Sequence, residues 1–191
     1  MSRTFLAFVA TLLFAVSATA QSTWDFDPAH SSAQFSVRHL GISTVRGAFT
    51  KVTGSAQFDE ANPSKSSVQA TIDAASVDTR VEIRDKDLRS PNFLDVEKYP
   101  TITFQSKKVE AVGQGQLKVT GDLTIHGVTK EVVLDVDGPT PAMKDPHGNV
   151  RRGAFATTKI NRREFGVNGA SGIAGDDLAI TLDVEMIQSA K

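Results

Sequence analysis

Residues 117–136 read LKVTGDLTIHGVTKEVVLDV, and this stretch decides the fold. Apolar or small residues occupy every second position from Leu117 to Ile125 and again from Val132 to Val136, which is the period of a strand with one buried face. Two such runs joined by a short turn that contains glycine predict a β-hairpin. The same alternation recurs on both sides of this hairpin, so most of the chain is predicted to form strands.

The remaining strands are predicted from the same alternation around residues 33–37, 45–49, 52–58, 68–72, 102–111, 154–160 and 178–186. The inward face changes from odd to even positions around Thr50-Lys51, which predicts a β-bulge or a sharp bend. About eight strands with short connections and no βαβ rhythm predict an all-β, antiparallel, up-and-down barrel. A β-sandwich is the alternative, because alternation fixes strand faces and not their order in space.

One insert, residues 84–94 (RDKDLRSPNFL), interrupts this pattern. Just before it, Thr79 and Glu82 fit a capping box that would open a helix running to about residue 90. Later breaks are a Pro-containing connection over residues 139–148 and a polar turn over residues 161–164. A polar helical insert that carries Leu88 and Phe93 can plug or line one end of a closed sheet.

Residues 1–20 have the pattern of a secretory signal peptide. Arg3 supplies a positive start, residues 4–16 are nearly all apolar, and Ala18-Thr19-Ala20 provides the small residues of a cleavage site. The apolar run is shorter than the roughly 20 residues that cross a bilayer, which argues against a membrane anchor. We therefore expect an exported product with a single domain over residues 21–191.

Charge and cysteine content exclude two classes of protein. The formal net charge is −1, and the loss of Arg3 would make it −2, so nucleic acid is not an expected partner. The chain has no cysteine, so disulfides cannot stabilise it outside the cytoplasm. Stability must come from a packed core, which about 170 residues can build as one domain.

The inward positions of the predicted barrel include many small residues, which leave room beside phenylalanine and leucine side chains. A hollow interior and a tight two-layer core both fit this composition, and the residues alone do not decide between them. The small inward residues are Ala33, Gly47, Gly54, Ala56, Ala70, Gly121, Ala154 and Ala156.

Neither catalysis nor metal binding is indicated. Asp27, His30 and Ser31 are the residue types of a hydrolytic triad, but they lie too close together on a turn into a strand. Hydrogen bonding to the chain that enters the first long strand is the expected role of Asp27 and His30. A zinc site from His30, His39 and His126 would need a convergence that their spacing does not show, and His126-Gly127 is better explained as a turn.

Several motifs in order resemble the YceI-like family. Residues 24–31, 35–43 and 45–49 resemble the N-terminal part of that family, and they read WDFDPAHS, FSVRHLGIS and VRGAF. Further matches cover residues 71–73, 76–79, 84–93, 99–106, 121–130 and 160–166, so the resemblance spans essentially the whole mature chain. Arg163 stands where the family usually has serine, which puts only that turn in doubt.

The resemblance implies an exported bacterial protein of the periplasm with a lipocalin-like barrel. It also implies an apolar tunnel that binds polyisoprenoids or related amphiphiles, such as the tail of an isoprenoid quinone, with no settled catalytic activity and no cofactor. We therefore expect binding, storage or transport of such a lipid, with transient membrane contact, by a monomer or a homodimer. An enzyme acting on such a lipid and a protein-binding stress-response module with a filled core are the alternatives.

The candidate contacts to the lipid tail are large apolar residues of the predicted barrel and insert, although plain core packing explains each one equally well. They are Phe35, Val37, Phe49, Leu88, Phe93, Phe104, Leu123, Phe155 and Leu182. Candidates for the polar head group are the ionisable residues Arg38, His39, Arg84 and Asp85, because each is flanked by inward apolar positions. For Arg84-Asp85, an anchor between the insert and the barrel wall is the favoured alternative.

Overall fold

Twelve strands form one antiparallel sheet in the computed structural model, which describes residues 21–189. The predicted signal peptide lies outside the described residues. The predicted strands are all present, and three short ones, β1, β6 and β10, are added. The bounds are β1 Ser22–Phe26, β2 Ser32–His39, β3 Ser43–Phe49, β4 Val52–Phe58, β5 Ser67–Asp73, β6 Val77–Asp78, β7 Thr101–Gly113, β8 Gln116–Ile125, β9 Val128–Asp137, β10 Met143–Lys144, β11 Val150–Asn161 and β12 Ala174–Gln188.

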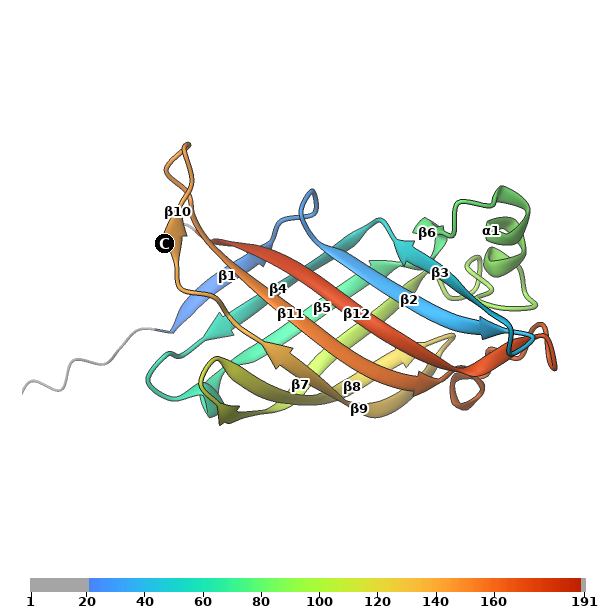
Figure 1. Ribbon diagram of the computed structural model, residues 1–191. Helices are drawn as coiled ribbons and strands as arrows, with labels where there is room; N and C mark the ends of the chain where they lie inside the picture. The colour runs from blue at the N-terminus through green and yellow to red at the C-terminus, as the bar shows by residue number, and fades with distance from the viewer. Residues whose placement is uncertain (1–20, 190–191) are drawn as a thin grey trace, which may run out of the picture.

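Pairing of β11 with β12 closes the sheet into a barrel (Figure 1). The closed ring contains eight strands in the order β1, β4, β5, β7, β8, β9, β11 and β12. Closure removes the free edges that an open sheet would expose. The predicted antiparallel barrel is therefore confirmed, and the sandwich alternative is wrong.

The hairpin of β8 and β9 has a two-residue turn, with Ile125 paired to Val128. His126 and Gly127 both have positive φ, 51° and 74°, which suits the right-handed twist of the strands. A Cβ atom at Gly127 would lie 2.5 Å from Cε1 of Tyr99, whose ring packs on His126 with centroids 4.4 Å apart. The turn that the sequence predicted is thus fixed both by backbone conformation and by a neighbouring ring.

The chain bends at two places, and these bends separate one end of the barrel from the other. The chain breaks between β1 and β2 and again between β3 and β4, where the sequence predicted the slip at Thr50-Lys51. Beyond these bends β2 and β3 continue along β12, but the outer edge of β3 pairs only with the two residues of β6. This leaves one end of the wall incomplete, and the helical insert lies at that end (Figure 1).

The insert forms α1 (Glu82–Arg89), and the chain turns after Ser90 as predicted. The predicted capping box is wrong, because Val81 is the N-cap residue and no side chain caps the helix. Thr79 instead donates from its backbone N and its Oγ1 to Oδ1 of buried Asp85, at 2.9 and 2.5 Å. No helix within residues 21–189 is long and apolar enough to cross a membrane.

Three short 3-10 helices complete the described chain: η1 Pro63–Lys65, η2 Ala74–Ser76 and η3 Arg162–Phe165. The last of these lies where the sequence predicted a polar turn. Arg162 and Phe165 are in fact buried, because the following loop folds back over η3 and accepts hydrogen bonds from Arg162.

Candidate functional site: an apolar tunnel

The barrel encloses an apolar cavity of about 220 Å³, here called the inner chamber. Its lining comes from all the ring strands and includes the predicted tail contacts Phe104, Leu123 and Leu182. These three side chains are only partly buried although they face the interior, because they border empty space. A filled core would bury them against other atoms at the density of an organic crystal. The interior is therefore hollow.

A second cavity of about 320 Å³, here called the outer chamber, lies at the incomplete end of the wall. Residues of β2, α1 and the segment after α1 line it, among them the predicted tail contacts Val37, Leu88 and Phe93. Charged side chains also reach this chamber, so it is the less uniformly apolar of the two.

The two chambers adjoin through a shared ring of apolar side chains. The residues that line both are Phe35, Phe49, Ile102, Ile125, Ile160 and Ile180. Phe35 and Phe49 pack against each other with ring centroids 5.8 Å apart. The chambers therefore adjoin at this ring, and together they are here called the tunnel. Each chamber approaches or exceeds the lower size range of small-molecule sites.

The small inward residues have two roles. The alanines line the inner chamber, as expected for residues that leave space, whereas the glycines lie beneath aromatic rings. Aromatic rings lie directly over the inward glycines: an added Cβ would be 2.5 Å from Cζ of Phe35 at Gly47 and 2.5 Å from Cζ of Phe104 at Gly121. The glycines therefore let these rings lie flat against the neighbouring strand. The empty space lies beyond the rings, along the barrel axis.

One predicted tail contact is placed outside the tunnel. Phe155 lines neither chamber, and its side chain is 44% exposed on the outer face of β11. Its neighbours Ala154 and Ala156 face inward, which follows from the alternation of strand residues. We therefore remove Phe155 from the candidate contacts.

The predicted head-group residues have separate surroundings. Arg38 and His39 line the outer chamber, but the Arg38 guanidinium donates to Thr44 Oγ1 at 2.8 Å and to the carbonyls of Gly41 and Ile42 at 2.6 and 3.1 Å. Arg38 is therefore largely committed to the turn between β2 and β3. The His39 ring makes no hydrogen bond with residues 21–189 that would occupy it, so it is the freer of the two.

Arg84 and Asp85 anchor the insert, as the alternative for this pair proposed. Arg84 lines the outer chamber, yet it donates through Nε to Thr79 Oγ1 at 2.7 Å and through Nη2 to Thr79 O at 3.0 Å. Asp85 lines neither chamber, and within residues 21–189 it accepts hydrogen bonds from Thr79 alone. Both side chains thus join α1 to the end of β6.

Two arginines that the sequence did not single out line the two chambers. Arg162, 6% exposed, lines the outer chamber and donates to the carbonyls of Val167, Gly169 and Gly175 at 2.7–2.9 Å. Burial lowers the pKa of Arg162, while Asp176 opposes that shift. Arg162 therefore fixes the loop that forms one wall of this chamber.

Arg152 lines the inner chamber, away from the outer one. Its guanidinium lies over the rings of Trp24 and Phe58, 5.0 and 5.4 Å from their centroids, and pairs with Glu60. All of these residues except Glu60 line the inner chamber. The cation is stabilised by ring faces, and its alkyl chain adds to an apolar wall.

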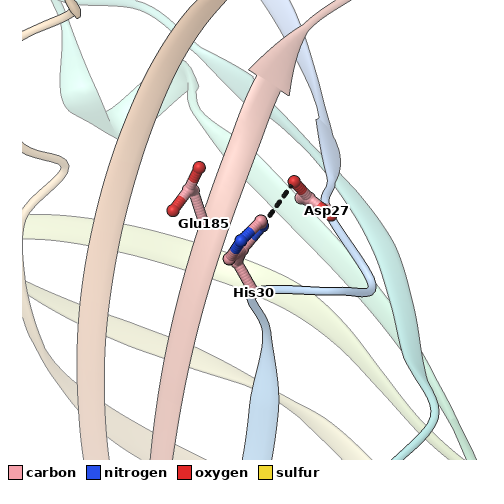
Figure 2. Close-up of side chains that lie close together, drawn as sticks. All are labelled: Asp27, His30 and Glu185. Atoms are coloured by element: carbon pink, nitrogen blue, oxygen red, sulfur yellow. Dashed lines mark hydrogen bonds and ion pairs between the residues drawn. The ribbon is translucent and has the colours of Figure 1, made fainter. Parts of the chain in front are cut away.

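A charged cluster joins the bend after β1 to β11 and β12, away from both chambers. Asp27, His30 and Glu185 lie close together, and Nδ1 of His30 is 2.9 Å from Oδ2 of Asp27 (Figure 2). Nη1 of Arg151 lies 2.6 Å from both Asp27 Oδ2 and Glu185 Oε1. A guanidinium thus occupies the place between the carboxylates that a metal ion would take.

The electrostatics of this cluster follow from that guanidinium. Hydrogen bonding from Arg151, followed by that from His30, lowers the pKa of Asp27 to about 2. The Asp27 carboxylate in turn raises the pKa of His30. Asp27 also accepts from Ala29 N at 3.0 Å, which confirms the expected role of Asp27 in holding the chain that enters β2. The His30 ring instead bonds to the Asp27 side chain.

Two arrangements considered from the sequence, the Asp27-His30-Ser31 triad and the three-histidine site, are not assembled among residues 21–189. Ser31 Oγ donates to Glu185 O at 3.2 Å rather than approaching His30, so no nucleophile and base pair forms. Among residues 21–189, the histidines His39 and His126 do not join His30 in a group with metal-ligand spacing.

Comparison with known proteins assigns the fold to a family. Residues 24–186 match the YceI-like domain. This chain belongs to the YceI-like family. A UPF0312 protein of Vibrio cholerae is 41% identical over 177 residues, which cover 92% of this chain and 93% of the relative.

Solved structures of similar proteins share the YceI-like barrel. The Campylobacter jejuni YCEI protein is 33% identical, with a TM-score of 0.70 and coverage of 80% of this chain and 90% of that chain. A polyisoprenoid binding domain from Saccharophagus degradans is 15% identical, with a TM-score of 0.66 and coverage of 89% and 100%. At that identity the second likeness shows the fold alone.

Proposed function

We propose that this protein binds an isoprenoid or a related amphiphilic lipid, and that it stores or carries this lipid after export from the cytoplasm. The observation that supports the proposal most strongly is the hollow, apolar inner chamber that continues into the outer chamber. The domain from Saccharophagus degradans is described as polyisoprenoid binding, and its fold is shared.

The tail of the lipid would lie in the inner chamber. Burial of apolar surface contributes roughly 25 cal/mol per Å², or about 0.8 kcal/mol per methylene, so a dry chamber can hold a tail without a covalent bond. Arg152 lines the inner chamber beside its aromatic partners, whereas most of the charged side chains reach the outer chamber. The polar end of the lipid would therefore lie in the outer chamber.

His39 is the head-group contact that the geometry favours. It lines the outer chamber, whereas Asp85 does not, and Arg38 and Arg84 donate to protein acceptors. Asp87, at the same chamber, is a further polar residue that sequence reasoning missed. A neutral head with both donor and acceptor groups, such as a phenol or the quinol form of a quinone, suits a chamber lined by an imidazole and a carboxylate.

A binding role is proposed rather than catalysis, because the polar residues at the outer chamber include no nucleophile and base pair. The enzyme alternative predicts that Ala at Asp27 or His30 abolishes turnover of the lipid in a folded protein. Because both residues lie outside the chambers, we expect neither variant to lose bound lipid.

Native mass spectrometry of the protein purified from bacteria tests the proposal, with Leu123→Trp as the variant. The larger ring would fill part of the inner chamber, so bound lipid should fall severalfold while the melting temperature changes little. Phe155→Trp is the matched control on the outer wall, and it should keep its lipid. An empty wild-type protein in every preparation, or equal lipid in both variants, would overturn the proposal.

A further inference from the structure

The rim of the outer chamber carries exposed aliphatic side chains, here called the rim tip: Leu40, Ile42 and Ile173. They are 55%, 79% and 49% exposed. Leu40 and Ile42 lie in the turn between β2 and β3, and Ile173 lies just before β12. The backbone N of Leu40 donates to Ile173 O at 2.8 Å, so the two loops form one surface. Ile173 also lines the outer chamber, which places this surface at its edge.

Folding does not account for these residues. Leu40 has a φ of +50°, a left-handed conformation in which asparagine or glycine is far better tolerated than leucine. It gains no burial in return, because more than half of its surface faces solvent. Single exposed apolar residues are ordinary, but three on one joined surface beside a cavity mark an interaction site.

The β2–β3 side of the rim tip is positively charged. Arg38 and Arg46 lie on these two strands, and residues 28–58 contain no aspartate or glutamate. On the other side, Asp176 follows Ile173 by three residues and is paired with Arg162 and Arg163. Arg38 is held at the turn through its bonds to Gly41 O and Ile42 O. None of the ion pairs among residues 21–189 involves Arg38 or Arg46. The facing loop, residues 166–173, carries no charged residue.

We propose that the rim tip docks on the surface of an anionic phospholipid bilayer. Leu40, Ile42 and Ile173 insert among the lipids, while exposed Arg46 faces the phosphate groups and Arg38, held by its bonds to the turn, adds positive charge. Aliphatic side chains that enter the interface next to cations are the combination by which proteins bind anionic membranes reversibly.

Docking in this way would bring the opening of the tunnel to the lipid. The outer chamber would then face the bilayer, and an apolar tail could move between the two without crossing water. This inference rests on the proposed function, because only a lipid cargo gives the docked state a purpose. It adds the surface and the partner that such transfer needs.

Flotation of the full-length mature protein with vesicles tests the proposal. One set of vesicles contains phosphatidylcholine and phosphatidylglycerol in equal parts, and the other contains phosphatidylcholine alone. The wild type should float with the anionic set and less with the neutral one. Arg46→Gln should weaken binding to the anionic set about fivefold, the effect of one cation near such a surface.

The double variant Leu40→Asn and Ile42→Ser removes most of the apolar surface without touching a chamber. It should fold, since asparagine suits the left-handed position, and its vesicle binding should fall at least about tenfold. Val112→Asn is the matched control, because Val112 is also 55% exposed but lies near the β7–β8 turn, at the opposite end. It should bind vesicles like the wild type.

Measurement of bound lipid in the same variants separates this proposal from the proposed function. The rim-tip variants should keep their lipid, because Leu40, Ile42 and Arg46 line neither chamber. Vesicle binding that is unchanged in the double variant, or absent in the wild type, would overturn docking even when lipid is bound. Equal binding to both vesicle sets would overturn the choice of an anionic surface. If the rim-tip substitutions weaken vesicle binding in a protein that never holds lipid, that result would support docking and contradict the carrier function.

Discussion

The inner chamber is walled almost entirely by paired strands, whereas the outer chamber is walled by strands on one side and by α1 and the 166–173 loop on the other. Backbone ladders hold the first wall along its whole length. A few buried polar side chains, chiefly Arg162 and Asp85, hold the second. The shape of the inner chamber is therefore set by local packing, and that of the outer chamber by single side chains whose loss releases a whole segment.

The largest expected effect is the loss of Arg162 at the outer chamber. Arg162→Ala leaves several buried carbonyls without a donor, so the free energy of unfolding should fall by about 3 kcal/mol or more. Arg163→Ala is the control, because this neighbour is exposed and its pair with Asp176 contributes less than about 1 kcal/mol. Chemical denaturation of both variants measures the difference, and equal losses would contradict the role given to Arg162.

A substitution at the inner chamber should cause a smaller loss of stability, and its cause should be a steric clash. In Gly121→Ala the new Cβ would lie 2.5 Å from Gln105 O and from Cζ of Phe104, which should cost about 1–3 kcal/mol. The displaced ring should also reduce bound lipid. Gly153→Ala is the control, since its Cβ would meet no atom closer than 3.8 Å. Thermal unfolding and lipid content that match the wild type in Gly121→Ala would show that the ring does not lie against the glycine.

Substitution of a residue that anchors α1 should lower stability more than substitution of a residue in the first turn of the helix. Thr79→Val removes the hydroxyl that donates to Asp85 and accepts from Arg84, so stability should fall by about 1–2 kcal/mol. Glu82→Ala, which a capping box would make comparably harmful, should change stability by less than about 0.5 kcal/mol. Denaturation curves decide, and a larger loss for Glu82→Ala would restore the capping box.

The smallest effect should come from the charged cluster, which touches neither chamber. The pKa of Asp27 is about 2 in the folded protein, so its contribution is present above about pH 4 and is lost as the pH falls toward 2. The pKa of His30 is raised, so its contribution is complete below its ordinary pKa and is lost as the pH rises through the raised value.

Asp27→Asn should therefore flatten the acid side of a stability profile measured against pH, while bound lipid at neutral pH stays the same. A pH profile that keeps its acid slope in the variant would assign that slope to other carboxylates. Lipid loss in this variant would mean that the cluster and the tunnel are coupled.

Strand alternation predicted which face most residues occupy, and the assignment of Phe155 as a tail contact was wrong because it followed size and apolar character instead of alternation. Phe155 is large and apolar but lies between two inward alanines, so parity places it outside. Apolar residues are common on protein surfaces, and parity is the stronger evidence within a strand. The change of parity at Thr50-Lys51 predicted the bend between β3 and β4 for the same reason.

The buried polar contacts could not be predicted from the sequence. Arg162 bonds to carbonyl groups, which every residue has, so no pattern of residue types marks its partners. Thr79 lies three residues before Glu82 and six before Asp85, and only the path of the chain decides which carboxylate it meets. The signal that was available for Arg162 is the pair of apolar residues Phe165 and Val167 just after it, which indicates a buried turn rather than a polar one.

The most direct test of the central claim is a crystal structure of the protein purified from bacterial cells with its native lipid. We expect continuous elongated electron density that begins between Phe104 and Leu182 in the inner chamber, passes the shared ring at Phe35 and Phe49, and ends beside His39. An interior filled by the protein's own side chains, with no such density, would contradict the account.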